Sequence, residues 1–299
     1  MTAKFLKLRD YVLLLSVVSI FSFGCGTSEK NDKESAAEPL DSTASNILNV
    51  NGQIFSIPSP IQTAMMIKQS GANYNKEMLN SAQNSSTYST SFKKALNLGV
   101  YGADLGYVTI YEQTQDAISY LNSVKKIADD LGVSGAFTPE TVNRFQKNLG
   151  NKDSLLALVS VGYRASDAYL KNNDRSEVSG LILTGGWIES LNFAVSVLKI
   201  KDNEEVKRRI AEQKSSLNSL IKLLNANYSQ PEYAQLVDAL QDLSKVFDGI
   251  EFKYSYEKPT VDLDKKLTII NSKTEVKISA EQVQAISEKA KSIRNQIVG

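Results

Sequence analysis

The chain has 299 residues, with 34 Lys and Arg against 33 Asp and Glu, one Cys and no His. Without histidine there is no Ser-His-Asp or Cys-His nucleophile pair and no imidazole metal ligand, and one cysteine excludes an intrachain disulfide and a CxxC motif. Apolar residues at 42% and charged residues at 22% are typical of a globular protein, so a disordered chain or an integral membrane bundle is disfavoured.

The first 25 residues have the pattern of a bacterial export signal. Three basic side chains precede an uncharged, mostly apolar stretch at 11–24, which is shorter than the about 20 apolar residues of a bilayer-spanning helix. Residues 1–24 are therefore predicted to be a signal peptide. The sequence Ser22-Phe23-Gly24-Cys25 resembles the lipobox of bacterial lipoproteins, although that family usually has Leu in place of Ser22.

The lipobox resemblance implies that Cys25 is acylated. Three acyl chains, at about 0.8 kcal/mol per buried methylene, would anchor the chain permanently in a membrane. The alternative is a buried free cysteine in an N-terminal helix. Gly26 stands where an Asp would resemble an inner-membrane retention signal, so we expect the outer membrane, with the periplasmic and surface faces both open.

Residues 25–46 are predicted to be the lipidated cysteine and a flexible linker. They are rich in small polar and charged residues and cannot bury enough apolar surface to fold. Without residues 1–24, which hold three basic residues and one acidic residue, 31 basic and 32 acidic residues remain, a net charge of −1. Because a nucleic-acid binder normally has a strong basic excess, nucleic acid is excluded as a partner.

The folded part, residues 47–299, is predicted to be a single domain. It opens with two β-prone runs, 47–50 and 53–57, around Asn51-Gly52, which is a strong hairpin signal. Helical patterns follow, and short polar turns between them favour an antiparallel bundle. The predicted helical segments are 61–69, 75–80, 90–131 (one helix or two), a helix capped at Thr138-Pro139, 154–171, 175–199, 203–226 and 232–247.

Near the C-terminus the pattern alternates with a period of two at 250–256 and 274–278, with 267–270 as a partner strand. Ser279 with Gln282 predicts a capping box for a last helix ending near Val298. Strands at both ends suggest one sheet that pairs the termini. The predicted fold is mainly α: a multi-helix antiparallel bundle with a small β-sheet formed by segments near the N- and C-termini.

Two of the predicted helices are apolar nearly all round, which is typical of buried helices. In the first, a stripe of small residues at Ala95, Gly99, Gly102 and Gly106 would let another helix approach closely. Asp104 is the only charge between Lys94 and Glu112, and Glu189 is the only charge in 181–198. Both acids are therefore expected inside the protein. The second helix also has the length of a membrane span, but its central acid favours a core helix.

Two interpretations of the buried acids stay open. In a functional one, Asp104 and Glu189 face one pocket as general acid and base of a hydrolase, with Trp187 as a stacking platform and tyrosines as orienting donors. The candidate binding residues are Trp187, Tyr101, Tyr107 and Tyr111. In the structural one, each carboxylate accepts hydrogen bonds from tyrosines, Asn192 or an arginine such as Arg164 and fixes the helix register. The sequence contains no metal or cofactor motif, and none is expected.

Several segments together resemble a group of uncharacterised Bacteroidota lipoproteins: Gly24-Cys25, Ile57-Pro58-Ser59-Pro60, the run from Ala95 to Leu105, and Gly185-Gly186-Trp187-Ile188-Glu189. The likeness covers most of the mature chain and implies an envelope location and a helical fold, but no activity and no catalytic residue.

The sequence as a whole leaves three hypotheses about function. The first is a non-catalytic binding or assembly subunit of an envelope complex. The alternatives are a glycan- or peptide-binding lipoprotein and a carboxylate-dependent hydrolase.

Overall fold

The computed structural model describes residues 46–50, 53–57, 59–136, 138–173, 175–200, 202–263 and 265–299, which all belong to one compact unit. Cys25, the linker and the Asn51-Gly52 turn lie outside the described residues. The helices are α1 Pro60–Gln69, α2 Ser91–Ile110, α3 Thr114–Asp130, α4 Pro139–Lys147, α5 Lys152–Asn172, α6 Ser176–Ile200, α7 Glu204–Asn225, α8 Pro231–Asp248 and α9 Ala280–Val298, with 3-10 turns η1 Lys76–Met78, η2 Ala82–Ser86 and η3 Ser134–Ala136. The mainly α prediction is confirmed.

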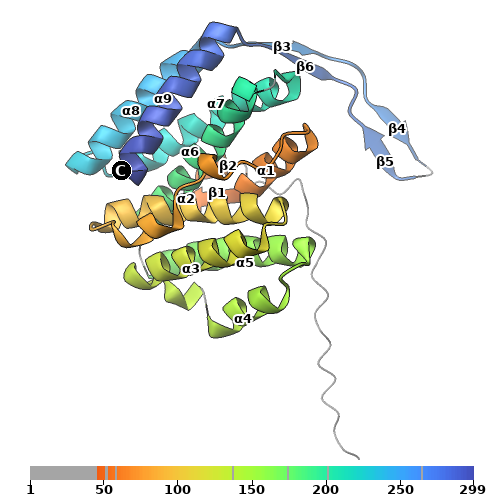
Figure 1. The fold of residues 1–299 in the computed structure, drawn as a ribbon. Helices are drawn as coiled ribbons and strands as arrows, with labels where there is room; N and C mark the ends of the chain where they lie inside the picture. The colour runs from red at the N-terminus through yellow and green to blue at the C-terminus, as the bar shows by residue number, and fades with distance from the viewer. Residues whose placement is uncertain are drawn as a thin grey trace, which may run out of the picture. The chain divides into compact units, whose positions relative to one another are not determined.

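Helix α2 and helix α6 form the centre of the protein and pack along their length. Helices α3 to α5 lie on one side of this pair and α7 to α9 on the other (Figure 1). All residues of α2 from Ala95 to Ile110 are buried, and so are nearly all of α6 from Val178 to Val197. The prediction that both helices are buried is confirmed.

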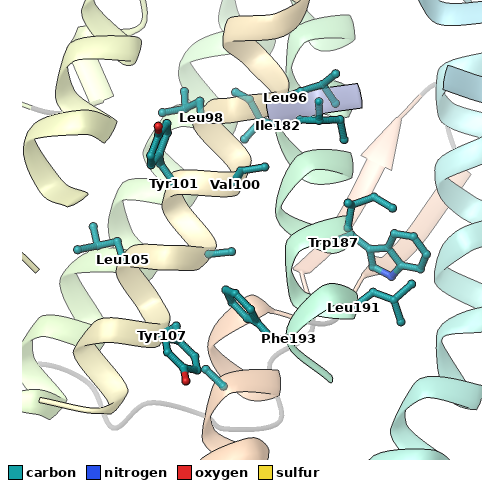
Figure 2. Close-up of a cluster of buried hydrophobic side chains, with 14 of the residues drawn as sticks. Leu96, Leu98, Val100, Tyr101, Leu105, Tyr107, Ile182, Trp187, Leu191 and Phe193 are labelled. Carbon is teal, nitrogen blue, oxygen red and sulfur yellow. The ribbon is translucent and has the colours of Figure 1, made fainter. Parts of the chain in front are cut away.

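Gly99, from the stripe of small residues on α2, and Gly185 of α6 explain how closely the two helices approach. A Cβ atom built at Gly99 would lie 1.9 Å from the carbonyl oxygen of Ile182, and one at Gly185 would lie 1.9 Å from that of Leu96. Both positions therefore admit only glycine at this helix separation. Large side chains such as Leu96, Ile182 and Phe193 fill the space beside this contact (Figure 2).

Several helix starts follow from local hydrogen bonds in the sequence. The predicted capping box of Ser279 and Gln282 is present, and Ser59 and Gln62 form a second one before α1. Thr138 caps α4 ahead of a proline at its first position, as predicted. Helix α5 begins at Lys152, two residues before the predicted segment 154–171, because the Asn151 side chain accepts from the Ser154 backbone N–H and caps the helix there.

The strands differ from the prediction in their pairing. Strand β1 (Asn46–Val50) pairs antiparallel with β2 (Gln53–Ile57), and β3 (Glu251–Ser255) pairs with β6 (Lys273–Lys277). Strand β5 (Leu267–Ile269) pairs with β4 (Thr260–Asp262), which the sequence analysis missed. Among the described residues no sheet joins the two ends of the chain, because each strand pairs with its neighbour in its own region.

Residues 250–278 form an arm of two successive antiparallel ribbons between α8 and α9, and Figure 1 shows it leading away from the helices. All residues of β3 and β5 are exposed, and β4 and β6 each have one half-buried residue. The arm therefore contributes little to the core.

Among the described helices, α6 is the one long and apolar enough to cross a membrane, with a mean hydropathy of 1.5. However, 83% of its most apolar window is buried against other helices. Because a buried helix needs apolar residues on every side, this composition is accounted for by its central position in the bundle.

Candidate functional site

Asp104 and Glu189 meet at the α2–α6 contact. Both residues are fully buried, with 0% exposure. The two carboxyl groups lie close enough to interact directly, and Asp104 Oδ2 accepts from the backbone N–H of Asn80 at 3.2 Å. The acids predicted to be buried are therefore brought together, in direct contact rather than across a pocket.

Arg294 of α9 neutralises this pair. Its Nε donates to Glu189 Oε2 at 2.5 Å, and its Nη2 donates to Oε1 at 2.7 Å and to the Met78 carbonyl oxygen at 3.1 Å. The Arg294 side chain is 14% exposed. This two-point contact is the strongest form of guanidinium–carboxylate pair, and it joins α6 to α9.

Sequence reasoning missed Arg294, although the helix pattern carries a signal. The buried residues Ile286, Ala290, Ile293 and Ile297 define the apolar face of α9. Arg294 is four residues after Ala290 and three before Ile297, so it lies on that face. A cation on an apolar face is normally paired with a buried acid. The side chain of Arg164, the arginine named in the structural interpretation, lies outside the described residues.

The surroundings of the acid pair favour a proton on Asp104 over one on Glu189. Burial raises the pKa of Asp104 well above its ordinary value, and the neighbouring Glu189 carboxylate raises it further. Burial also raises the pKa of Glu189, but Arg294 opposes this shift. Asp104 Oδ1 has no hydrogen-bond partner among the described residues. A neutral Asp104 beside the Glu189 carboxylate and the Arg294 guanidinium would leave the site without net charge.

Asn80, in the loop between η1 and η2, connects the acid pair to polar groups of α2, of α3 and of the segment before α2. Its backbone carbonyl accepts from the Tyr120 hydroxyl at 2.9 Å, and its Nδ2 donates to the Tyr88 hydroxyl at 2.8 Å and to Asn97 Oδ1 at 3.3 Å. Asn97 Nδ2 in turn donates to the carbonyl oxygen of Ile297 at 2.8 Å. These bonds satisfy most of the buried polar atoms around the pair, as a stable core requires.

This arrangement is suited to holding helices together. A general acid or base must contact a substrate, yet both residues have no exposed surface, Glu189 is bonded to Arg294, and Asp104 accepts from a backbone amide. This burial is closer to the structural interpretation of the acids, but the partners are Arg294 and the Asn80 backbone N–H instead of tyrosines and Asn192. Asn192 does not bond to them; its Nδ2 faces the Met78 carbonyl oxygen at 3.5 Å.

The four candidate binding residues lie in or at the edge of the core. Trp187 is 2% exposed and lies on the side of α6 away from α2 (Figure 2). Tyr101 and Tyr107 are fully buried; the Tyr101 hydroxyl donates to the Ser81 carbonyl oxygen, and the Tyr107 hydroxyl accepts from the Asn75 backbone N–H. Tyr111 is half-buried and donates to the Ala72 carbonyl oxygen. The indole leaves no open face on which a ligand could stack.

The Trp187 Nε1–H donates to Gln213 Oε1 of α7 at 3.0 Å. We expect Gln213→Met to reduce the free energy of unfolding by about 1–3 kcal/mol, because the buried indole N–H loses its acceptor. Urea unfolding followed by the emission of this single tryptophan measures the change. Gln284→Met is the control, because Gln284 bonds only to an exposed Glu288 side chain; equal unfolding midpoints for the two variants would contradict the prediction.

Within the described ranges, no group of three or more His, Cys, Asp or Glu side chains is placed to hold a metal ion. Cys25, the predicted lipid attachment point, is not among the described residues. Comparisons with protein-family models, with curated proteins and with solved structures find no match for this chain, so its function has to be argued from the geometry above.

Proposed function

We propose that the protein is a non-catalytic binding or assembly subunit of the cell envelope, lipid-anchored to the outer membrane through Cys25. The lipobox pattern and the likeness to Bacteroidota lipoproteins support the location. The observation that carries the binding role is the arm, residues 250–278, because it exposes large apolar side chains while the buried acids are closed off from ligands.

One face of the first ribbon is apolar and aromatic. Phe252 and Tyr254 alternate along β3, Tyr256 follows at the next alternate position beyond its end, and Phe252 lies opposite Val276 in the register. Phe252 is 43% exposed, Tyr254 65% and Tyr256 70%. Tyrosine and other aromatic residues are enriched in protein interfaces, and a contiguous exposed apolar patch marks an interaction site.

The opposite face of the same ribbon is polar, with balanced charges. Lys253 lies opposite Glu275, and Glu251 lies opposite Lys277. Cross-strand pairs of opposite charge stabilise a ribbon in water. Because the arm lacks the excess of basic residues that attracts an anionic membrane surface, a protein partner is favoured over lipid. We therefore propose that the partner is an envelope protein with an apolar surface strip that accepts aromatic side chains.

Site-specific photocrosslinking in cells tests this role. A photoreactive amino acid at Tyr256 is expected to give a discrete crosslink to one envelope protein. The triple variant Phe252→Ser/Tyr254→Ser/Val276→Ser, which removes the apolar face but keeps the crosslinker, is expected to abolish that crosslink. The control is Tyr228→Ser, which changes an exposed tyrosine of the helical body, 43% exposed.

The identity of the crosslinked molecule distinguishes a protein partner from lipid and from a second copy of the chain. A crosslink that persists in the triple variant, or one only to lipid, would overturn docking of a protein on this face. A crosslink to a second copy of the chain would also overturn it, because the arm would then be a self-association element. Equal helical circular dichroism for all variants is required, and we expect it because Phe252 and Tyr254 are exposed and Val276 is only partly buried where the arm meets the helices.

A further inference from the structure

A polar pocket of about 370 Å³ lies where the last turns of α6, the η1 region and α9 meet. It is separate from the arm and from the Trp187 side of α6. Three cationic side chains line it, Lys199, Lys291 and Arg294, together with the amides of Asn75, Asn192 and Asn295. The one acid in its lining is Glu77, an exposed residue.

The two lysines in this pocket are not neutralised by protein carboxylates. Across the part of the chain that the structure describes, neither Lys199 nor Lys291 has an ion pair with an acid, whereas Arg294 is paired with Glu189 through Nε and Nη2 and makes no hydrogen bond with Nη1. The positive charges of Lys199 and Lys291 lie close enough to repel each other. Partial burial lowers the pKa of Lys291, and the neighbouring Lys199 and Arg294 lower it further.

Positive charges held together in a concave site favour the binding of an anion, because the bound anion removes their repulsion. The asparagine side chains indicate a second property of the ligand. An Asn side chain both donates and accepts, which suits hydroxyl groups. Asn192 lines this pocket and is only 4% exposed, and its Nδ2 faces the Met78 carbonyl oxygen, so its side-chain amide is held in place by the surrounding helices.

We propose that this pocket binds a small anionic carbohydrate, with its phosphate or carboxylate group on Lys199, Lys291 and Arg294 and its hydroxyl groups on the three asparagines. The volume lies within the range of small-molecule sites, about 300–1,000 Å³. Arg294 then has two functions: Nε and Nη2 hold Glu189, and Nη1 is free for the ligand. The proposal does not depend on the docking role of the arm.

Isothermal titration calorimetry of the full chain in detergent tests the proposal. The probes are glucose 6-phosphate and glucuronate, with glucose as the neutral sugar, inorganic phosphate as the bare anion and glycerol 3-phosphate as the lipid headgroup. Both anionic sugars are expected to bind, and glucose is not. The double variant Lys199→Gln/Lys291→Gln is expected to weaken their affinity at least about tenfold, because charge-assisted hydrogen bonds are lost.

The matched control is Lys147→Gln/Lys222→Gln, which removes the same charge at two exposed lysines outside the pocket. Equal loss of affinity in both double variants, or no binding of either anionic sugar, would overturn the proposal. Inorganic phosphate binding as tightly as glucose 6-phosphate, or glycerol 3-phosphate binding more tightly, would overturn the assignment to a carbohydrate. The lysine variants leave the core untouched, so circular dichroism is expected to be unchanged.

Discussion

Gly185→Ala is expected to lower the free energy of unfolding by more than about 3 kcal/mol, which is a large part of a typical domain's stability. The added Cβ would lie 1.9 Å from the Leu96 carbonyl oxygen and 2.8 Å from its carbonyl carbon. Because these are backbone atoms of a buried helix, no side-chain rotation relieves the overlap. Helices α2 and α6 would have to separate, and the packing on both sides of them would be lost.

Gly106→Ala is the matched control, on the same stripe of small residues as Gly99. Its Cβ would meet only Ile61 Cγ1, at 3.2 Å, and this flexible side chain can move. Alanine also favours a helix over glycine by roughly 1 kcal/mol, so this variant is expected to be neutral or slightly stabilised. Urea unfolding followed by circular dichroism compares the two. If Gly185→Ala keeps the midpoint of the wild type, α2 and α6 do not pack as described.

Arg294→Met is expected to destabilise the protein by about 3–5 kcal/mol, because it leaves the Glu189 carboxylate buried without its cation. The double variant Glu189→Gln/Arg294→Met removes both charges and is expected to be more stable than the single one. Arg208→Met is the control for loss of a guanidinium; Arg208 is 54% exposed and pairs with Glu212 across one helix turn, so its loss is expected to cost at most about 1 kcal/mol. Equal unfolding midpoints for Arg294→Met and Arg208→Met would contradict the assignment of a buried pair.

The same site predicts a pH dependence through Asp104. Its pKa is raised in the folded state, so the stability linked to it is full below the unfolded pKa, about 3.9, and is lost as the pH rises through the folded value. Asp104→Asn keeps the shape, and its amide can donate to Glu189. The free-energy advantage of this variant over the wild type is expected to grow from about pH 4 upwards. Unfolding curves across this range measure it, and a constant difference would place the proton elsewhere.

The helices could be predicted from the sequence because their signals are local. The apolar residues on all sides of α2 and α6 indicated burial, and the small-residue stripe indicated a close helix contact. The capping residues Ser279 and Thr138 marked helix starts correctly. The strand pairing was not predicted correctly, because alternation identifies a strand without identifying its partner. The short β4, Thr260–Asp262, has too few residues to show a period.

The candidate site could be predicted in part. Asp104 and Glu189 are conspicuous as single charges in apolar helices, so their burial follows from the sequence. The contact of Glu189 with Arg294 does not follow, because helical periodicity places a residue on a face but does not say which helix that face meets. The same limit applies to Trp187: a lone tryptophan beside two glycines is compatible with a ligand platform, and only the position of α7 shows that Gln213 occupies its polar edge.

The position of Arg294 in the chain also has a consequence for the timing of folding. Glu189 is made 105 residues before its cation, and at about 5–20 residues per second a ribosome needs roughly 5–20 s to cover that distance. Throughout this interval α2 and α6 can associate only by burying Glu189 without its cation. The nascent chain therefore cannot complete the buried ion pair, and with it the α6–α9 contact, until the last helix has been made.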